Sequence, residues 1–85
     1  MKRDIREFYE YFQLYNIPQE VRSDCNGLTV INTGTSVAIL EGLEIQPGAQ
    51  YYAPGNEDEL NTTRYRLSFD NTGTNVVLVI RKIYK

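Results

Sequence analysis

The spacing of hydrophobic positions changes near residue 24 of the chain. Over about residues 1–16, charged and amide side chains alternate with apolar residues at helical spacing, namely Ile5, Phe8, Tyr9, Phe12 and Tyr15. Asp4 suits an N-cap, with Glu7 at the capping-box position three residues later. Pro18 disfavours helical geometry in the residue before it. This pattern predicts an N-terminal amphipathic helix that ends near Asn16.

From Asp24 onward, the pattern becomes one of alternating apolar and polar residues, rich in Val, Ile, Thr and Tyr. It is clearest over residues 64–70, where Tyr65, Leu67 and Phe69 point to one side of a strand. We expect about six strands, near residues 28–32, 36–41, 43–46, 50–53, 63–70 and 75–84. Short strands separated by turn signals predict a mainly β fold, an antiparallel sandwich or partly open barrel with the N-terminal helix attached.

An internal repeat lies within this β region. Residues 28–40 align without gaps to residues 67–79, and each copy is centred on Asn-Thr-Gly-Thr. We expect Gly34 and Gly73 to supply positive φ, and Asn32 and Asn71 to form Asx turns. Each copy is therefore predicted to be a β-hairpin. Between the copies, residues 47–48 are Pro-Gly, which predicts a type II turn and a third hairpin.

The last predicted strand is apolar on both sides. Residues 76–80 read Val-Val-Leu-Val-Ile and do not alternate, so both faces of this strand require cover. An opposing sheet covers one face, and the helix or a second subunit must cover the other, because an exposed apolar strand promotes aggregation. An 85-residue domain buries only ~60% of its unfolded surface, which also favours association. We expect a helical arm over residues 1–23 and a β-sandwich domain over residues 24–85.

The composition of the chain argues against most kinds of catalysis and against metal or phosphate binding. The chain has no histidine, the commonest general base and a usual ligand of zinc and iron. Its single cysteine, Cys25, cannot form an internal disulfide, and we interpret it as a semi-buried small residue. The glycines form no phosphate-binding loop, and the acidic residues of 54–59 match no calcium loop. We expect no catalytic residues, no cofactor and no metal.

Charge and hydropathy narrow the class of partner. Nine basic and eleven acidic residues give a net charge of −2 and are scattered, which argues against nucleic acid. No apolar run reaches the ~20 residues of a membrane span, and no cationic-then-apolar pattern resembles a secretion leader, so we expect synthesis in a reducing cytoplasm. Seven tyrosines and three phenylalanines fit either a core rimmed by aromatic residues or a contact surface.

Aromatic residues are the candidate partner contacts. The predicted helix packs either on its own sheet or on a neighbouring protein, and in the second case its aromatic stripe forms the contact. The predicted third hairpin adds two adjacent tyrosines. The predicted partner-binding residues are Phe8, Tyr9, Phe12, Tyr15, Tyr51 and Tyr52. An alternative function is a small carbohydrate-binding module, in which exposed tyrosines stack on sugar rings.

Four segments carry a resemblance to a known class of proteins: Asn-Thr-Gly-Thr-Ser-Val at 32–37, Leu-Glu-Ile-Gln-Pro-Gly at 43–48, Tyr-Arg-Leu-Ser-Phe at 65–69 and Arg-Lys-Ile-Tyr-Lys at 81–85. Over residues 28–85 the chain resembles small β-sandwich virion proteins of tailed bacteriophages, particularly of Bacteroides-type hosts. The resemblance implies a capsid decoration, neck or tail protein in many symmetric copies. Its expected partners are copies of itself and other virion proteins (capsid, portal or tail). The resemblance adds no active-site residue and does not include the N-terminal segment.

Overall fold

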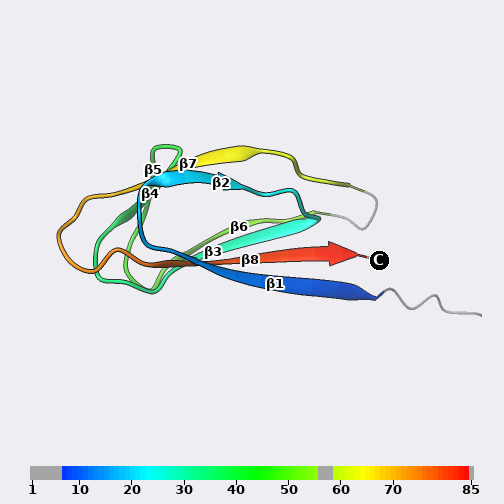
Figure 1. The fold of residues 1–85 in the computed structure, drawn as a ribbon, viewed down its shortest axis with the longest axis horizontal. Helices are drawn as coiled ribbons and strands as arrows, with labels where there is room; N and C mark the ends of the chain where they lie inside the picture. Colours follow the sequence, from blue (N-terminus) through cyan, green and yellow to red (C-terminus); the bar gives the residue numbers. More distant parts are fainter. Residues whose placement is uncertain (1–6, 56–58, 85) are drawn as a thin grey trace, which may run out of the picture.

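The computed structural model describes residues 7–55 and 59–84, which form two four-stranded antiparallel sheets packed face to face (Figure 1). Sheet A has the strand order β1-β8-β3-β6, and sheet B has the order β2-β7-β4-β5. The strands are β1 (Phe8–Tyr15), β2 (Gln19–Arg22), β3 (Gly27–Asn32), β4 (Ala38–Leu40), β5 (Leu43–Ile45), β6 (Gln50–Ala53), β7 (Arg64–Phe69) and β8 (Val77–Tyr84). The chain is therefore a mainly β protein with a sandwich-like fold.

The core lies between the two sheets and is formed by alternate residues of the strands. Val30 and Val79 of sheet A are fully buried, and Leu67 of sheet B is nearly so. In β7, the residues on either side of Leu67 are partly or fully exposed, as expected for a strand with one buried face. Fully burying a side chain of this size stabilises the fold by about 2 kcal/mol. The remaining core residues are Tyr15, Val21, Cys25, Leu28, Ala38, Leu40, Ile45, Phe69 and Val77.

The predicted N-terminal helix is wrong over the described residues. Residues 8–15 form β1, which pairs with β8 from Phe8↔Tyr84 to Tyr15↔Val77. The segment fits both the helical period and the two-residue period of a strand, because its apolar residues also occupy alternate positions. Aromatic side chains favour strands, and without β1 the apolar strand β8 would have an open edge, so pairing in the sheet prevails over the helix. The part of the prediction on residues 1–6 lies outside the described residues.

The six predicted strands correspond to β3 through β8, and β1 and β2 add two strands that the sequence pattern did not indicate. β1 belongs to sheet A and β2 to sheet B, so the chain changes sheets between Tyr15 and Gln19. The predicted division at residue 23 stays a prediction. Arg81 ties the two sheets together near this crossing, because its Nε donates to the Arg22 carbonyl at 2.8 Å and its Nη2 to the Tyr15 hydroxyl at 2.8 Å.

All three predicted hairpins are wrong, because each turn carries the chain from one sheet to the other. β3 and β4 lie in different sheets, as do β5 and β6, and β7 and β8. The two repeat copies cross in opposite directions, and β3 pairs with β8 while β4 pairs with β7. The hairpin in this region joins β4 to β5 through Glu41 and Gly42, whose φ values of 48° and 82° suit a type I′ turn.

The two Asn-Thr-Gly-Thr loops pack against each other. Neither Gly34 nor Gly73 has positive φ, contrary to the prediction. Both are required for close approach: a Cβ on Gly34 would clash with the Thr74 carbonyl oxygen, and one on Gly73 with Oγ1 of Thr35. The Gly34 amide donates to the Val76 carbonyl at 3.0 Å, and the Thr74 amide donates to Thr35 Oγ1 at 2.7 Å. The two copies of the repeat therefore hold the two sheet crossings against each other, and we call this contact between the two loops the clamp.

The predicted turn chemistry is right in part. Asn32 Oδ1 accepts the Gly34 amide at 3.0 Å, which confirms that Asx turn. In the second copy Asp70 takes this role, because its Oδ1 accepts the Thr72 hydroxyl at 2.8 Å and the Thr72 amide at 3.1 Å. These bonds lower the pKa of the Asp70 carboxyl. The type II turn is confirmed by Gly48, with φ of 83°, and by the Ala49 amide, which donates to the Gln46 carbonyl at 2.9 Å.

Candidate assembly surface on sheet A

The face of sheet A that points away from sheet B carries apolar residues on all four strands. The register places Leu78 of β8 between Leu14 of β1 and Ile31 of β3. The next row contains Phe12, Ile80, Thr29 and Tyr52 in the same way. Side chains of paired residues stand on the same side of a sheet, so these rows form one surface. We call it the outer apolar face, and define it by Phe8, Phe12, Leu14, Ile31, Tyr52, Leu78, Ile80 and Tyr84.

Much of the outer apolar face is open to solvent at β1 and β6. Phe12 is 63% exposed, Leu14 66% and Tyr52 58%, while Leu78 and Ile80 in the middle of the sheet are half-buried. The alternate residues of β8, Val77 and Val79, are fully buried in the core. The prediction that the last strand is apolar on both faces is therefore confirmed. No described segment covers its outer side completely.

One end of the outer apolar face carries its charged residues. Glu10 lies opposite Lys82 on the neighbouring strand. Lys82 Nζ lies 4.3 Å from the ring centroid of Phe8 and 5.2 Å from that of Tyr84, within the range of cation–π attraction. The Phe8 and Tyr84 rings meet edge to face with centroids 6.1 Å apart. This arrangement leaves the rows at Phe12 and Leu14 without charge.

β1 also exposes aromatic residues on its other face. Tyr9 is 48% exposed and Tyr11 is 52% exposed, and their ring centroids lie 6.2 Å apart. Residue 15, at the end of the same face, is buried. The first half of β1 thus projects past the cover of sheet B, as the ribbon indicates (Figure 1). An edge strand with aromatic residues on both faces is a strong candidate for pairing with another chain.

The free edge of β1 presents the backbone groups of every second residue. The Lys82 carbonyl accepts the Asn26 amide at 2.8 Å, and the Tyr84 amide donates to Asn26 Oδ1 at 2.8 Å, so both residues of β8 face β3. Backbone groups alternate between the two sides of a strand, so residues 77, 79, 81 and 83 face β1. Their partners on β1 are residues 15, 13, 11 and 9. The backbone groups that point to the free edge belong to Phe8, Glu10, Phe12 and Leu14.

The six predicted contact residues do not form one cluster. Phe8, Phe12 and Tyr52 lie on the outer apolar face, whereas Tyr9 lies on the opposite side of β1. The other two face the core: residue 15 is 6% exposed, and the half-buried residue 51 packs edge to face on Tyr65, with centroids 6.0 Å apart. The contact role of all six, Phe8, Tyr9, Phe12, Tyr15, Tyr51 and Tyr52, stays a prediction.

The structure adds Leu14, Ile31, Leu78 and Ile80 to the surface that sequence reasoning proposed. The signal that could have found Leu14 is the alternation of Phe8, Phe12 and Leu14 at even positions, which the helical interpretation concealed.

Carbohydrate binding needs two or three aromatic residues on one open face. Tyr51 and Tyr52 point to opposite sides of β6, and the carbohydrate alternative stays a prediction.

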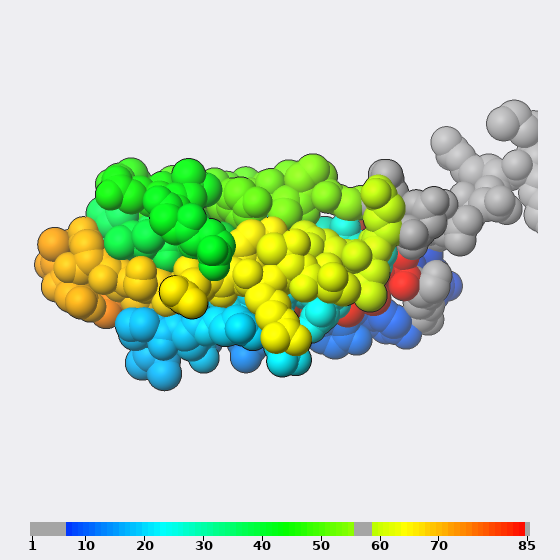
Figure 2. Space-filling model, turned by 90° about the horizontal axis from the view of Figure 1, so that it is seen from above, coloured from blue at the N-terminus to red at the C-terminus, as the bar shows by residue number. Residues whose placement is uncertain are grey.

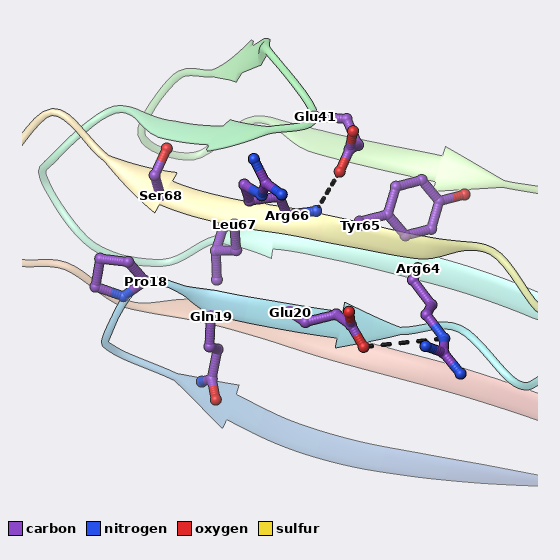
Figure 3. Close-up of a pocket in the computed structure, with 9 residues that line it drawn as sticks. All are labelled: Pro18, Gln19, Glu20, Glu41, Arg64, Tyr65, Arg66, Leu67 and Ser68. Atoms are coloured by element: carbon purple, nitrogen blue, oxygen red, sulfur yellow. Dashed lines mark hydrogen bonds and ion pairs between the residues drawn. The ribbon is translucent and has the colours of Figure 1, made fainter.

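The outward face of sheet B differs in character, because it is polar. Figure 2 shows this side of the molecule, with β2 and β7 next to each other. A groove of about 440 Å³ lies over these strands (Figure 3). Glu20 lies 3.4 Å from Arg22 and 3.9 Å from Arg64, and the Glu41 carboxylate accepts the backbone amide of Arg66. The residues that line the groove are Pro18, Gln19, Glu20, Glu41, Arg64, Tyr65, Arg66, Leu67 and Ser68.

Within the part of the chain that the structure describes, one thiol lies buried in the core. Cys25 is fully buried, its thiol donates to the Gly27 carbonyl at 3.2 Å, and burial raises its pKa against the opposing effect of the Arg81 charge. In residues 7–55 and 59–84, no three His, Cys, Asp or Glu side chains gather as a metal site would need, and no helix could span a membrane. No family model matches the chain, and neither a curated protein nor a solved structure matches it.

Proposed function

We propose that this protein is a non-catalytic structural subunit that assembles through β1 and the outer apolar face of sheet A. The observation that carries the proposal is the state of β1, an eight-residue edge strand with exposed aromatic residues on both faces. Natural proteins protect such edges with charges, prolines or a covering element. The single charged residue of β1 is Glu10, β1 contains no proline, and no strand of the described residues pairs with its outer edge, so a partner strand would protect it.

The size of the protein favours the same function. The core of the described residues is one layer between two small sheets, with valine, alanine and cysteine among its members. Small domains gain stability from disulfides, metals or association. Cys25 is the only cysteine of the chain, so an internal disulfide is excluded. Association through the outer apolar face would bury Phe12, Leu14 and Tyr52 and increase the apolar area removed from water.

We further propose that the assembly is the virion of a tailed bacteriophage. The support is the resemblance of residues 28–85 to small β-sandwich virion proteins, together with a sandwich-like fold and an unprotected edge. In this role the protein is made in the host cytoplasm and occupies the capsid surface, the neck or the tail. Its partners are copies of itself and capsid, portal or tail proteins. Symmetric repetition of one small interface is the usual way in which such assemblies form.

The test is the mass of the protein in solution, measured by light scattering across the micromolar range. We expect the wild-type chain to reach multiples of 9.8 kDa, and we expect Phe12→Lys to reduce the mass toward that of one chain. Losing a contact anchor costs about 2 kcal/mol or more of association, roughly a 30-fold weaker interface.

A matched control is Leu43→Lys, which places the same charge on an exposed apolar residue of sheet B. Leu43 is 50% exposed, close to the exposure of the β1 residues, and lies on the other sheet. We expect this variant to assemble as the wild type does. A wild-type chain that stays at 9.8 kDa at every concentration, and that binds no capsid, portal or tail protein, would contradict the proposal.

A further inference from the structure

We infer that the partner of β1 is β1 of a second copy, paired antiparallel about a two-fold axis at Tyr11, so that two A sheets become one continuous eight-stranded sheet. This inference rests on the proposed function and specifies its partner. It follows from three properties of β1: the direction of its backbone groups, the position of its one charge, and the symmetry of its apolar pattern.

The backbone direction limits the possible registers. The groups available at the free edge belong to Phe8, Glu10, Phe12 and Leu14, as the pairing of β1 with β8 requires. A hydrogen-bonded pair across the new interface must therefore join two even-numbered residues. Registers that place an even residue opposite an odd one would leave backbone groups of both strands without partners, at a cost of about 1–3 kcal/mol for each buried group.

The charge and the overlap of the strands select one of the remaining registers. A register with Glu10 opposite Glu10 of the second copy is disfavoured, because like charges directly opposite are destabilising. A register with Phe12 opposite Phe12 forms about six hydrogen bonds and leaves Phe8 beyond the end of the partner strand. The register with Tyr11 opposite Tyr11 pairs all four even residues and forms about eight hydrogen bonds.

The side chains of β1 are complementary in this register. On the outer side, Phe8 lies opposite Leu14 of the second copy, so the apolar rows continue across the axis. Glu10 lies opposite Phe12 of the second copy and keeps its own neighbour, Lys82. On the other side, the phenol of Tyr9 lies opposite the amide of Gln13, a pair that can hydrogen-bond. A surface that matches itself in this way is what an isologous dimer requires.

The exposed apolar side chains of β1 set the upper limit of the area that the dimer can bury. Phe8, Tyr11 and Phe12 are 47%, 52% and 63% exposed, and Leu14 is 66% exposed. With about 200 Å² for a fully exposed aromatic side chain, these residues present on the order of 400 Å² in each copy. Edge pairing covers the flanks of these side chains, so the ~1,000 Å² that separates biological interfaces from incidental ones is the upper limit for two copies with their edge backbone.

The sharpest test is a disulfide across the two-fold axis. In the proposed register the two Tyr11 residues form a non-hydrogen-bonded pair with Cα atoms ~4.5 Å apart, within the range that a disulfide bridges. We expect Tyr11→Cys to form a covalent dimer under mild oxidation, in which the introduced thiols of the two chains are bonded to each other. The native Cys25 is fully buried, and peptide mapping by mass spectrometry identifies any bond that it forms.

The matched control is Gln13→Cys on the same face of β1. In the proposed register its two copies are offset by four residues, or ~13 Å, too far for a disulfide. We expect Tyr11→Cys to crosslink at least about tenfold faster than Gln13→Cys. Equal rates, or preferential crosslinking of Gln13→Cys or of Phe12→Cys, would overturn the proposed register.

A second pair of variants tests the backbone contact alone. The amide of Glu10 points to the free edge, so Glu10→Pro removes a donor that the dimer uses and the β1–β8 pairing does not. We expect Glu10→Pro to fall to the mass of one chain with its strand content unchanged, and Glu10→Gln to remain dimeric. If both variants assemble like the wild type, β1 pairing is wrong while assembly through the outer apolar face stands. If the wild type never assembles and binds no virion protein, both proposals fail.

Discussion

At the scale of single residues, Asn32 shows how this small core accommodates polar groups. Its side chain is buried, and Nδ2 donates to the carbonyls of Ser36 and Ile45 at 2.7 Å and 2.8 Å. Its Oδ1 accepts the Gly34 amide, so one amide side chain satisfies three backbone groups of two sheet crossings. A buried polar side chain is stable only when its hydrogen bonds are made. Asn32 therefore fixes the geometry of the crossings, as well as forming the turn that its position in the sequence indicated.

Cys25 gives a prediction of pH dependence. Burial raises the pKa of its thiol, so the folded protein prefers the neutral form. For such a group the stabilisation is complete below the unfolded pKa and is lost as pH rises through the folded pKa. We expect the free energy of unfolding of the wild type to fall above about pH 8.5, the ordinary value for a thiol. We expect Cys25→Ala to remove this part of the alkaline loss, as measured by urea unfolding at several pH values.

Thiol labelling provides an independent measurement. The thiolate is the reactive form, and Cys25 is both fully buried and held in the neutral form. A disulfide reagent should react with native protein far more slowly than with protein unfolded in urea. Rapid labelling of the native protein at neutral pH would show that the thiol is accessible, against its position in the core.

At the scale of elements, the Asn-Thr-Gly-Thr loops show why a turn signal does not determine what the turn connects. A loop with a glycine and an Asx turn suits a hairpin and also suits a crossing between sheets. The choice depends on which strand each neighbour finds, and β3 pairs with β8 while β4 pairs with β7. The glycines are required because the loops touch each other, a contact between segments that are distant in the sequence.

Substitution of these glycines tests the clamp. Gly34→Ala would place a methyl group against the backbone of Thr74, which cannot move without breaking its hydrogen bonds to the Thr35 and Ser36 amides. We expect it to lower the free energy of unfolding by about 2 kcal/mol or more. The control Gly42→Ala meets no atom within 4 Å and is strained only by its φ of 82°, so about 1 kcal/mol is expected. If Gly42→Ala cost more than Gly34→Ala in chemical denaturation, the clamp would be unimportant for stability.

The sequence determines the elements after residue 24 better than those before it. Alternation located β7 because one face of this strand is polar and the other packs on the core. β1 was missed because its apolar residues fit a helix as well as a strand, and the deciding factor is the unpaired edge of β8, which is distant in sequence. The sequence therefore indicated which aromatic residues of β1 are candidate contacts. It did not indicate that Phe8 and Phe12 lie on one face of the strand and Tyr9 on the other, because that division follows from strand geometry.

At the scale of the whole molecule, the outer faces of the two sheets differ in polarity. Sheet B carries Glu20, Arg22, Arg64 and Arg66 on its outward side, where ion pairs and water can satisfy them. Sheet A carries the outer apolar face and the unprotected edge of β1. Because hydrophobic patches on one side direct association to that side, we expect assembly to use sheet A and to leave the outer face of sheet B toward solvent.

If assembly stabilises the fold, the thermal midpoint must depend on protein concentration. When a dimer unfolds to two separate chains, its free energy of unfolding rises by about 1.4 kcal/mol for each tenfold increase in protein concentration. Each chain therefore gains half of this stabilisation. In a domain of this size about 1 kcal/mol moves the midpoint by roughly 4–8 °C, so each tenfold increase should raise it by a few degrees. Phe12→Lys removes the contact and should make the midpoint independent of concentration, while Leu43→Lys should keep the dependence. A wild-type midpoint that stays constant across the micromolar range would mean that the chain folds alone and that the exposed face of β1 contributes nothing to its stability.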